Sequence, residues 1–512
     1  MAIAKFVQGS ILRHILVMSS TAAIGISALF VVDLLDIFFL SLLGEQELAA
    51  AVGYAGTISF FTTSIGIGLS IALGALVSRA IGAKEIKKAK RLLLNSAVVT
   101  LLVSIVVAII VFVSIPQLLA LVGATGRTEE LAASYLYILV PSMPLICLAM
   151  ALGSALRAVG DAKLSMISTL VGGGVNAIFD PIFIFMFAMG IQGAAIASVL
   201  ARIAVLIVAA RGVIVKHDLF GQFNKAHFIE DLRPIFAIAG PAMLTNVATP
   251  IGNAVVTRAV ADFGDSYVAG WAILGRIIPV SFGMIFALSG AIGPIVGQNF
   301  GAREFDRVKE SLTRAIQFCC AYVLAVSVLL FFSRNLIVDV FDMKGDAADL
   351  ILFFCRYIAV FFVFSGILFV ANASFNNLGK AKYSSLFNVG KATVGTVPFV
   401  YFGAQWGGAY GVLIGQVLGS MIFGVLGVIV AYRLVEHARQ AVTERTGALS
   451  ADTTSDKKAQ SDEFNEELSL SNQSPLSSSC ANMAMVTEEQ DCEASSEVAE
   501  LIGVKNQQPP NP

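Results

Sequence analysis

Long apolar runs separated by short polar segments occupy most of this 512-residue chain. Each run is long enough, at about 20 residues or more, to cross a bilayer as a helix. The pattern predicts twelve transmembrane helices, at about 14–41, 50–78, 92–115, 131–156, 164–188, 191–212, 235–262, 267–298, 315–338, 347–376, 384–404 and 407–432. The predicted fold class is therefore an all-α integral membrane protein.

The twelve predicted helices form two sets of six, because the chain repeats itself. The segments 74–90 and 293–309 are identical at six of seventeen positions, at an offset of 219. The same offset relates Gly160-Asp-Ala-Lys163 to Gly379-Lys-Ala-Lys382. Since six spans return the chain to the side from which it started, the two repeats are predicted to be parallel.

Composition supports the membrane assignment, and the basic residues predict an orientation. Hydrophobic residues make up 57% of the chain and charged residues 13%, whereas a soluble domain carries about a quarter charged residues. Segments on the side of the N-terminus hold 22 Lys and Arg, and the opposite side holds three, Arg127, Arg334 and Lys344. The positive-inside rule then places both termini in the cytoplasm.

The predicted organisation has four parts. An N-terminal six-helix bundle (1–215) and a C-terminal one (234–440) flank a cytoplasmic linker (216–233). Residues 441–512 carry thirteen acidic and four basic residues with little periodicity, so we expect a disordered acidic cytoplasmic tail there, either a passive extension or a regulatory segment.

Motifs for most enzyme classes are missing from the sequence. It contains no GxxxxGK[ST] phosphate loop, no HExxH and no GxSxG, and its six cysteines have no metal-binding or pairing pattern. We therefore expect neither an enzyme nor a cofactor, and no nucleic-acid partner. Any energy for transport would come from an ion gradient.

Acidic residues inside predicted helices are the candidate functional groups. A charge at the bilayer centre costs about 2.5–3.5 kcal/mol on insertion scales, so it is kept where it pairs or functions. Asp36, Asn176, Asp180 and Ser198 are predicted to lie at similar depth on three helices, and Asn176 and Asp180 are four residues apart on one face. Pro181 frees a backbone carbonyl nearby.

These oxygen ligands suit a hard cation such as Na⁺, and a carboxylate pair withdrawn from water also suits H⁺. The sequence does not choose between the two ions. Asn176 and Ser198 alone would be explained by hydrogen bonds to a neighbouring helix. Asp33, one turn before Asp36, is a further candidate for the same site.

The second repeat lacks acids at the matching positions and carries basic residues instead. Arg258, Arg276, Arg356 and Lys391 lie within or near its predicted helices. Arg276 and Lys391 are candidates for lining a substrate cavity, and snorkelling to the membrane surface explains them equally well.

Four motifs, taken in order, carry a resemblance to a known family. They are Asp36-Ile-Phe-Phe-Leu-Ser-Leu-Leu-Gly44, the paired segments at 74–83 and 293–302, Leu156-Arg-Ala-Val-Gly-Asp-Ala-Lys163, and Asn176-Ala-Ile-Phe-Asp-Pro181. Residues 10–435 resemble the multidrug and toxic compound extrusion (MATE) family. The resemblance implies two six-helix bundles in a V that rock to alternate access. It also implies export of organic, often cationic, amphipathic compounds in exchange for Na⁺ or H⁺.

The resemblance carries the family's ion site onto Asp36, Asn176, Asp180 and Ser198, where a threonine is more usual at the last position. The absence of interior acids in spans 7 and 10 favours the prokaryotic branch that resembles the DNA-damage-inducible type. Asp33 is not expected from the family.

The hypothesis from the sequence is a secondary active antiporter, a monomer in the bacterial inner membrane, with small organic compounds and lipid as its partners. The alternative is a flippase for lipid-linked precursors, in which Arg258, Arg276 and Lys391 hold an anionic headgroup. An integral membrane enzyme is the third reading, and no paired catalytic groups support it.

Overall fold

The computed structural model describes the backbone of residues 4–41, 43 and 46–471. Within that range the side chains of residues 33–34, 37–38, 41, 46, 49 and 445–471 lie outside what is described. The chain divides into two compact units, Met1–Ala441 and Val442–Pro512.

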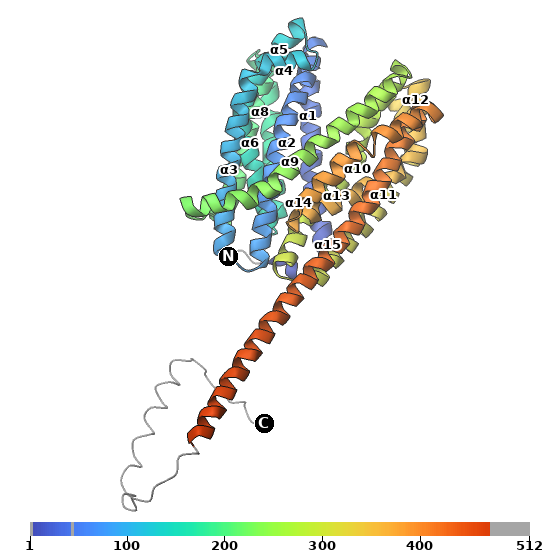
Figure 1. The fold of residues 1–512 in the computed structure, drawn as a ribbon. Helices are drawn as coiled ribbons and strands as arrows, with labels where there is room; N and C mark the ends of the chain where they lie inside the picture. Colours follow the sequence, from blue (N-terminus) through green and yellow to red (C-terminus); the bar gives the residue numbers. More distant parts are fainter. Residues whose placement is uncertain (1–3, 42, 44–45, 472–512) are drawn as a thin grey trace, which may run out of the picture. The chain divides into compact units, whose positions relative to one another are not determined.

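Helices build nearly the whole of the first unit (Figure 1). The first half contains α1 (Ile11–Ser41), α2 (Gln46–Gly82), α3 (Ile86–Val113), α4 (Ile115–Leu121), α5 (Gly126–Leu139), α6 (Met143–Ala158), α7 (Ala162–Pro181) and α8 (Gly190–Arg211). The second contains α9 (Lys225–Ala261), α10 (Asp265–Gly301), α11 (Phe305–Val340), α12 (Asp346–Phe353), α13 (Phe362–Asn377), α14 (Ala381–Ala392) and α15 (Val397–Ser471). The described part of the chain has no β-strand.

Short 3₁₀ and π segments continue or connect several helices. The 3₁₀ segments are η1 (Lys5–Val7), η2 (Val140–Ser142) and η6 (Ala359–Phe361), and the π segments are η3 (Ile182–Met186), η4 (Gly212–Lys216) and η5 (Phe354–Ile358). Two predicted spans, 131–156 and 347–376, are therefore broken near the middle. Pro141 lies in the first break, where a helix loses a backbone donor. No proline lies in the second break.

The duplication is visible in the packing. The contacts of α1 with α7, α2 with α3 and α2 with α6 recur as α9 with α14, α10 with α11 and α10 with α13. Between the halves, α2 packs on α9, and the equivalent pair α10 and α1 packs likewise. The repeated sequence thus produces a repeated arrangement of helices.

Eleven helical segments of the described chain are long and apolar enough to cross a membrane. The last of them, Ala381–Glu444, contains the two spans predicted at 384–404 and 407–432. Gly408, with φ 59° and ψ −144°, reverses the chain inside α15. A Cβ on Gly411 would lie 1.9 Å from the carbonyl oxygen of Gly403, so the two arms of the hairpin pack backbone to backbone. The prediction of twelve spans is consistent with this arrangement.

The tail differs from the prediction. Disorder was expected from residue 441, but α15 continues as a helix to Ser471. No proline, which would interrupt a helix, occurs between Pro398 and Pro475. Residues 472–512 lie outside the described residues.

Candidate functional site

The helices α1 and α7 approach closely enough for polar side chains to meet between them. Gly173 of α7 faces Val32 of α1, and a Cβ on that glycine would lie 3.1 Å from the valine Cγ2. Gly25 of α1 also lies against Thr169 of α7, two turns earlier on α1 and one turn earlier on α7. The small side chains of glycine let the two helices run side by side, and this carries Asp36 to Asn176.

Three of the predicted site residues form one hydrogen-bonded cluster. The Asn176 amide nitrogen donates to Asp36 Oδ1 at 2.7 Å and to Asp180 Oδ2 at 2.9 Å. Because both carboxyl groups accept from this one amide, Asp36 and Asp180 lie beside each other. Asp180 is fully buried and Asn176 is 3% exposed. The prediction that Asp36, Asn176 and Asp180 come together agrees with this geometry.

Ser198 of α8 is connected to the cluster through a residue that the sequence did not single out. Its hydroxyl lies close to the side chain of Tyr135 of α5, and Tyr135 in turn lies near Asp36 and Asp180. Tyrosine is common in spans near the membrane surface, so its presence at position 135 was only weak evidence for a role in the site. The side chain of Asp33 lies outside the described side chains, and its role stays a prediction.

Arg202 is a second residue that sequence reasoning missed, although its charge inside a predicted span was a usable signal. It lies one turn beyond Ser198 on α8. Its Nη1 donates to the carbonyl of Leu139 at 3.1 Å and to Ser142 Oγ at 2.8 Å. The guanidinium therefore ties α8 to the break between α5 and α6, close to Tyr135.

The local backbone of α7 keeps Asp180 in place. Pro181 ends the regular helix, and the π segment η3 continues it. Asp180 Oδ1 has no hydrogen-bond partner among the described residues. A buried carboxylate oxygen without a partner is costly, and a proton or a bound cation would remove that cost.

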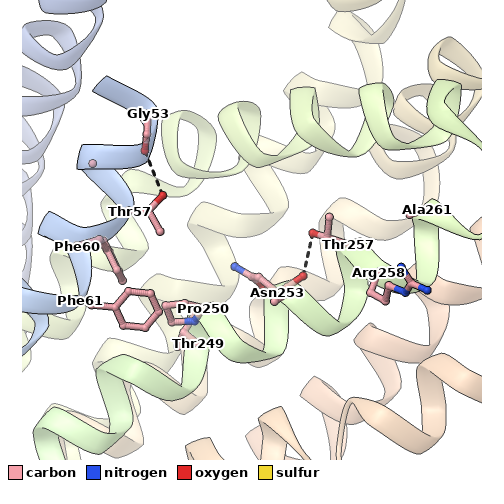
Figure 2. A pocket seen from close by; sticks show the side chains of 12 residues that line it. Gly53, Thr57, Phe60, Phe61, Thr249, Pro250, Asn253, Thr257, Arg258 and Ala261 are labelled. Atoms are coloured by element: carbon pink, nitrogen blue, oxygen red, sulfur yellow. Dashed lines mark hydrogen bonds between the residues drawn. The ribbon is translucent and has the colours of Figure 1, made fainter. Parts of the chain in front are cut away.

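A cavity of about 960 Å³ lies between the two halves (Figure 2). The helices α2 and α9 touch where Gly68 meets Met243. The cavity is lined further along both helices by Gly53, Gly56, Thr57, Phe60, Phe61, Thr249, Pro250, Asn253, Ala254, Thr257, Arg258 and Ala261. A volume of this size suits a small organic molecule.

The basic residues of the second half do not gather at this cavity. Arg258 lines it, whereas the candidates Arg276 and Lys391 are not among its lining residues. Lys391 Nζ instead donates to Ser365 Oγ at 3.1 Å, within the second half.

At the other end of α2, the two halves are in direct contact. A Cβ on Gly82 would lie 2.0 Å from the Gln298 carbonyl oxygen, and one on Gly301 would lie 2.0 Å from that of Arg79. Positions 82 and 301 are equivalent in the two repeats, as are 79 and 298. The contact is therefore the same in both directions, and any side chain beyond hydrogen at either glycine would separate the helices.

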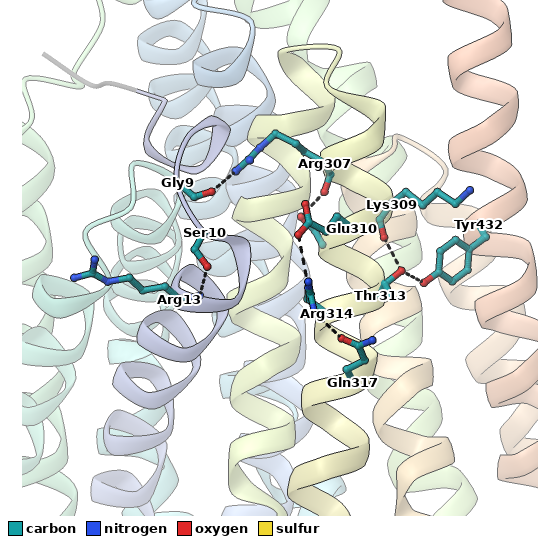
Figure 3. Close-up of polar contacts among 11 residues, drawn as sticks. Gly9, Ser10, Arg13, Arg307, Lys309, Glu310, Thr313, Arg314, Gln317 and Tyr432 are labelled. Carbon is teal, nitrogen blue, oxygen red and sulfur yellow. Dashed lines mark hydrogen bonds and ion pairs between the residues drawn. The ribbon is translucent and has the colours of Figure 1, made fainter.

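The N-terminal segment reinforces this end. Phe6 is buried, and its N–H donates to Gln298 Oε1 at 2.9 Å. Arg307 of α11 donates to the carbonyls of Phe6 and Gly9, and Figure 3 shows its side chain reaching Gly9. Gln298 also donates to the carbonyl of Ala158 in the first half. One polar network thus joins the N-terminus, α6, α10 and α11.

Comparisons with known proteins agree with this architecture. The family model described as MatE matches residues 22–182 and again 241–402. The chain is 25% identical over 438 residues to the FAD transporter of Shewanella oneidensis, which covers 84% of this chain and 97% of the relative. It is 22% identical to the multidrug export protein MepA of Staphylococcus aureus, with coverage of 84% and 95%.

A solved structure shows the same fold. A MOP superfamily transporter from Pyrococcus furiosus superposes with a TM-score of 0.79 over 86% of this chain and 99% of that one, at 23% identity. The fold and the matched family define a multi-pass helical membrane transporter, not an enzyme. The chain belongs to the MatE family of multidrug and toxic compound efflux transporters. The resemblance found in its motifs is confirmed at the level of the family.

Proposed function

We propose that this protein is a secondary active antiporter that exports amphipathic organic compounds in exchange for a cation bound at Asp36, Asn176 and Asp180. The observation that carries the proposal is the Asn176 amide, which bridges the two carboxyl groups at 2.7 and 2.9 Å inside the membrane. Two acids held by one amide, Asp180 buried and Asp36 partly buried, form a site whose charge would change when a cation binds.

Both H⁺ and Na⁺ remain candidate coupling ions, and one observation favours H⁺. The Asn176 amide holds the Asp36 and Asp180 carboxyl groups beside each other, and two neighbouring carboxyl groups tend to keep one proton between them. Ser198 and Tyr135 would hold the surrounding geometry. A proton could bind at this pair with no ligand beyond the two carboxyl groups.

Coupling between cation binding and compound binding would pass through α1, which contacts both α7 and α10. Cation binding changes how Asp36 of α1 is held against α7, and α1 packs on α10 across the boundary between the halves. Any cation-dependent shift of α1 would therefore alter the affinity of the cavity for its compound. Linkage then requires the compound to change the affinity for the cation by the same factor.

The relatives leave the substrate class open, since one is named a multidrug export protein and another a FAD transporter. The flippase alternative needs Arg258, Arg276 and Lys391 at one site, and only Arg258 lines the cavity. We also propose that the protein is a monomer in the bacterial inner membrane with both termini in the cytoplasm. We further propose that it belongs to the branch that resembles the DNA-damage-inducible type.

The test is transport in proteoliposomes, with a proton gradient and a sodium gradient imposed separately. Ethidium and flavin mononucleotide (FMN) serve as fluorescent cargoes. One of the two gradients is expected to drive export of at least one cargo, and Asp36→Asn or Asp180→Asn is expected to abolish the gradient-driven component. Asp339→Asn, which alters an exposed acid on α11, is the matched control. Full coupled export by both site variants would refute the proposal.

A further inference from the structure

The cavity between α2 and α9 has an apolar end and a cationic end. Phe60 and Phe61, 50% and 42% exposed, lie with Pro250 at one end. Arg258 lies at the other, and Asn253 lies between them (Figure 2). Exposed aromatic rings in a cavity offer stacking surface to a flat ring system.

Arg258 and Asn253 supply hydrogen-bond donors to this cavity. Arg258 makes no hydrogen bond or ion pair with any other described residue, and the Asn253 side-chain amide likewise has no described partner. Two of the three lining threonine hydroxyls already donate to backbone carbonyls, Thr57 to Gly53 at 3.1 Å and Thr257 to Asn253 at 3.0 Å. A guanidinium and an amide that are both free to donate favour a phosphate or a carboxylate.

The charge of the lining points the same way. Arg258 is the one charged residue among those that line the described cavity, and none of them is acidic. Asp262 follows the lining residue Ala261 directly but does not itself line the cavity. A cationic compound would therefore meet an unpaired positive charge, whereas an anion would neutralise it.

We propose that the cavity binds aromatic organic anions, with the ring system against Phe60 and Phe61 and a phosphate or carboxylate on Arg258 and Asn253. This inference deepens the proposed function and rests on it only in taking the cavity as the place where the exported compound binds. It replaces the expectation of mainly cationic substrates for this chain.

The test is fluorescence titration of the purified full-length protein in detergent. FMN and riboflavin carry the same ring system, and FMN adds a phosphate, while ethidium is an aromatic cation. We expect FMN to bind at least about 10-fold more tightly than riboflavin or ethidium, since charge-assisted hydrogen bonds supply that difference.

Variants assign the effect to the residue. Arg258→Ala is expected to weaken FMN binding about 10- to 100-fold and to leave riboflavin binding unchanged, and Arg258→Lys to retain part of the difference. Phe61→Ala is expected to weaken both flavins. Arg276→Ala removes the same charge from α10 outside the cavity lining and is the matched control, which should bind FMN like the wild type.

Each contrary outcome is informative. Tighter binding of ethidium than of FMN, or equal losses in Arg258→Ala and Arg276→Ala, would overturn the inference. Gradient-driven ethidium export without FMN binding would overturn the inference and leave the proposed function standing. Arg258-dependent FMN binding without any coupled transport would support the inference and overturn the proposed function.

Discussion

Asn176 shows how a single side chain can define a site in a membrane. Its amide nitrogen contacts a carboxylate on its own helix and another on α1. The spacing of Asn176 and Asp180 on one helix face was readable from the sequence. The contact with Asp36 required the packing of α1 on α7, which the sequence indicated only through similar depth.

The positions of three further side chains could not be predicted from the sequence. Tyr135 lies near the cluster and Arg202 lies near Tyr135, at the break at Val140–Ser142 where α8 packs on α5. Neither feature follows from hydrophobic periodicity. Lys391 was equally compatible with a cavity or with a local partner, and its bond to Ser365 depends on how the second half packs.

Asp161, between α6 and α7, offers a prediction about stability outside the membrane. Burial disfavours its ionised form, but hydrogen bonds from Lys216, His217 and the Leu164 N–H outweigh burial, so the pKa of Asp161 lies below its usual value of 3.8. Its stabilising contribution is then present above the usual pKa and is lost as the pH falls through the lowered pKa.

We therefore expect Asp161→Asn to destabilise the protein by about 1–3 kcal/mol at neutral pH. The exposed position of Lys216 favours the lower end of that range. Thermal unfolding of both proteins in detergent between pH 7 and pH 3 measures the difference, which should shrink below about pH 4. A difference that stays constant over this range would contradict the role given to Asp161.

At the scale of elements, length and apolarity were enough to place the spans. The chain reversal within α15 was expected as a gap between two helices, and Gly408 provides it with a positive φ. Breaks inside spans were less predictable. The interruption between α12 and α13 contains no proline. It consists of a π segment followed by a 3₁₀ segment, a geometry that the local sequence does not signal.

The approach of α1 to α7 at Gly173 yields a prediction at this scale. Gly173→Leu should push α1 away from α7, because a Cβ there already lies 3.1 Å from Val32. Separation of the helices would break the bond between Asn176 and Asp36. We expect at least a 10-fold loss of gradient-driven transport with binding of the compound retained.

Gly174→Leu is the control, since a Cβ at Gly174 meets no atom within 4 Å. Both variants are compared with the wild type in the proteoliposome assay, after their elution by size exclusion confirms a folded protein. Equal activity of Gly173→Leu and Gly174→Leu would show that the spacing of α1 and α7 does not govern coupling.

At the scale of the molecule, the duplicated sequence produces two halves that touch through equivalent residues. Gly82 packs on Gln298 and Gly301 packs on Arg79, while the cavity separates α2 from α9 nearer their other ends. Identical residues at equivalent positions had indicated the repeat, but not that the repeated glycines would face each other's helices. The two halves therefore touch at one end of α2 and leave a cavity toward the other.

The cation cluster lies within the first half and the cavity lies between the halves, so transport requires the two to communicate. The acids of the cluster belong to the first repeat, and Arg258, the charged residue of the cavity lining, belongs to the second. Under the proposed antiport, binding of a compound in the cavity should expel the cation from Asp36, Asn176 and Asp180.

Cation release on binding is the most direct measurement of this account. The purified protein in weakly buffered detergent is mixed with saturating FMN or ethidium, and released ions are followed with a pH-sensitive dye and, in parallel, a Na⁺-sensitive dye. The wild type is predicted to release one kind of cation, and Asp180→Asn to bind the same compound with no release. Equal release from Asp180→Asn and the wild type would contradict the assignment of the coupling site.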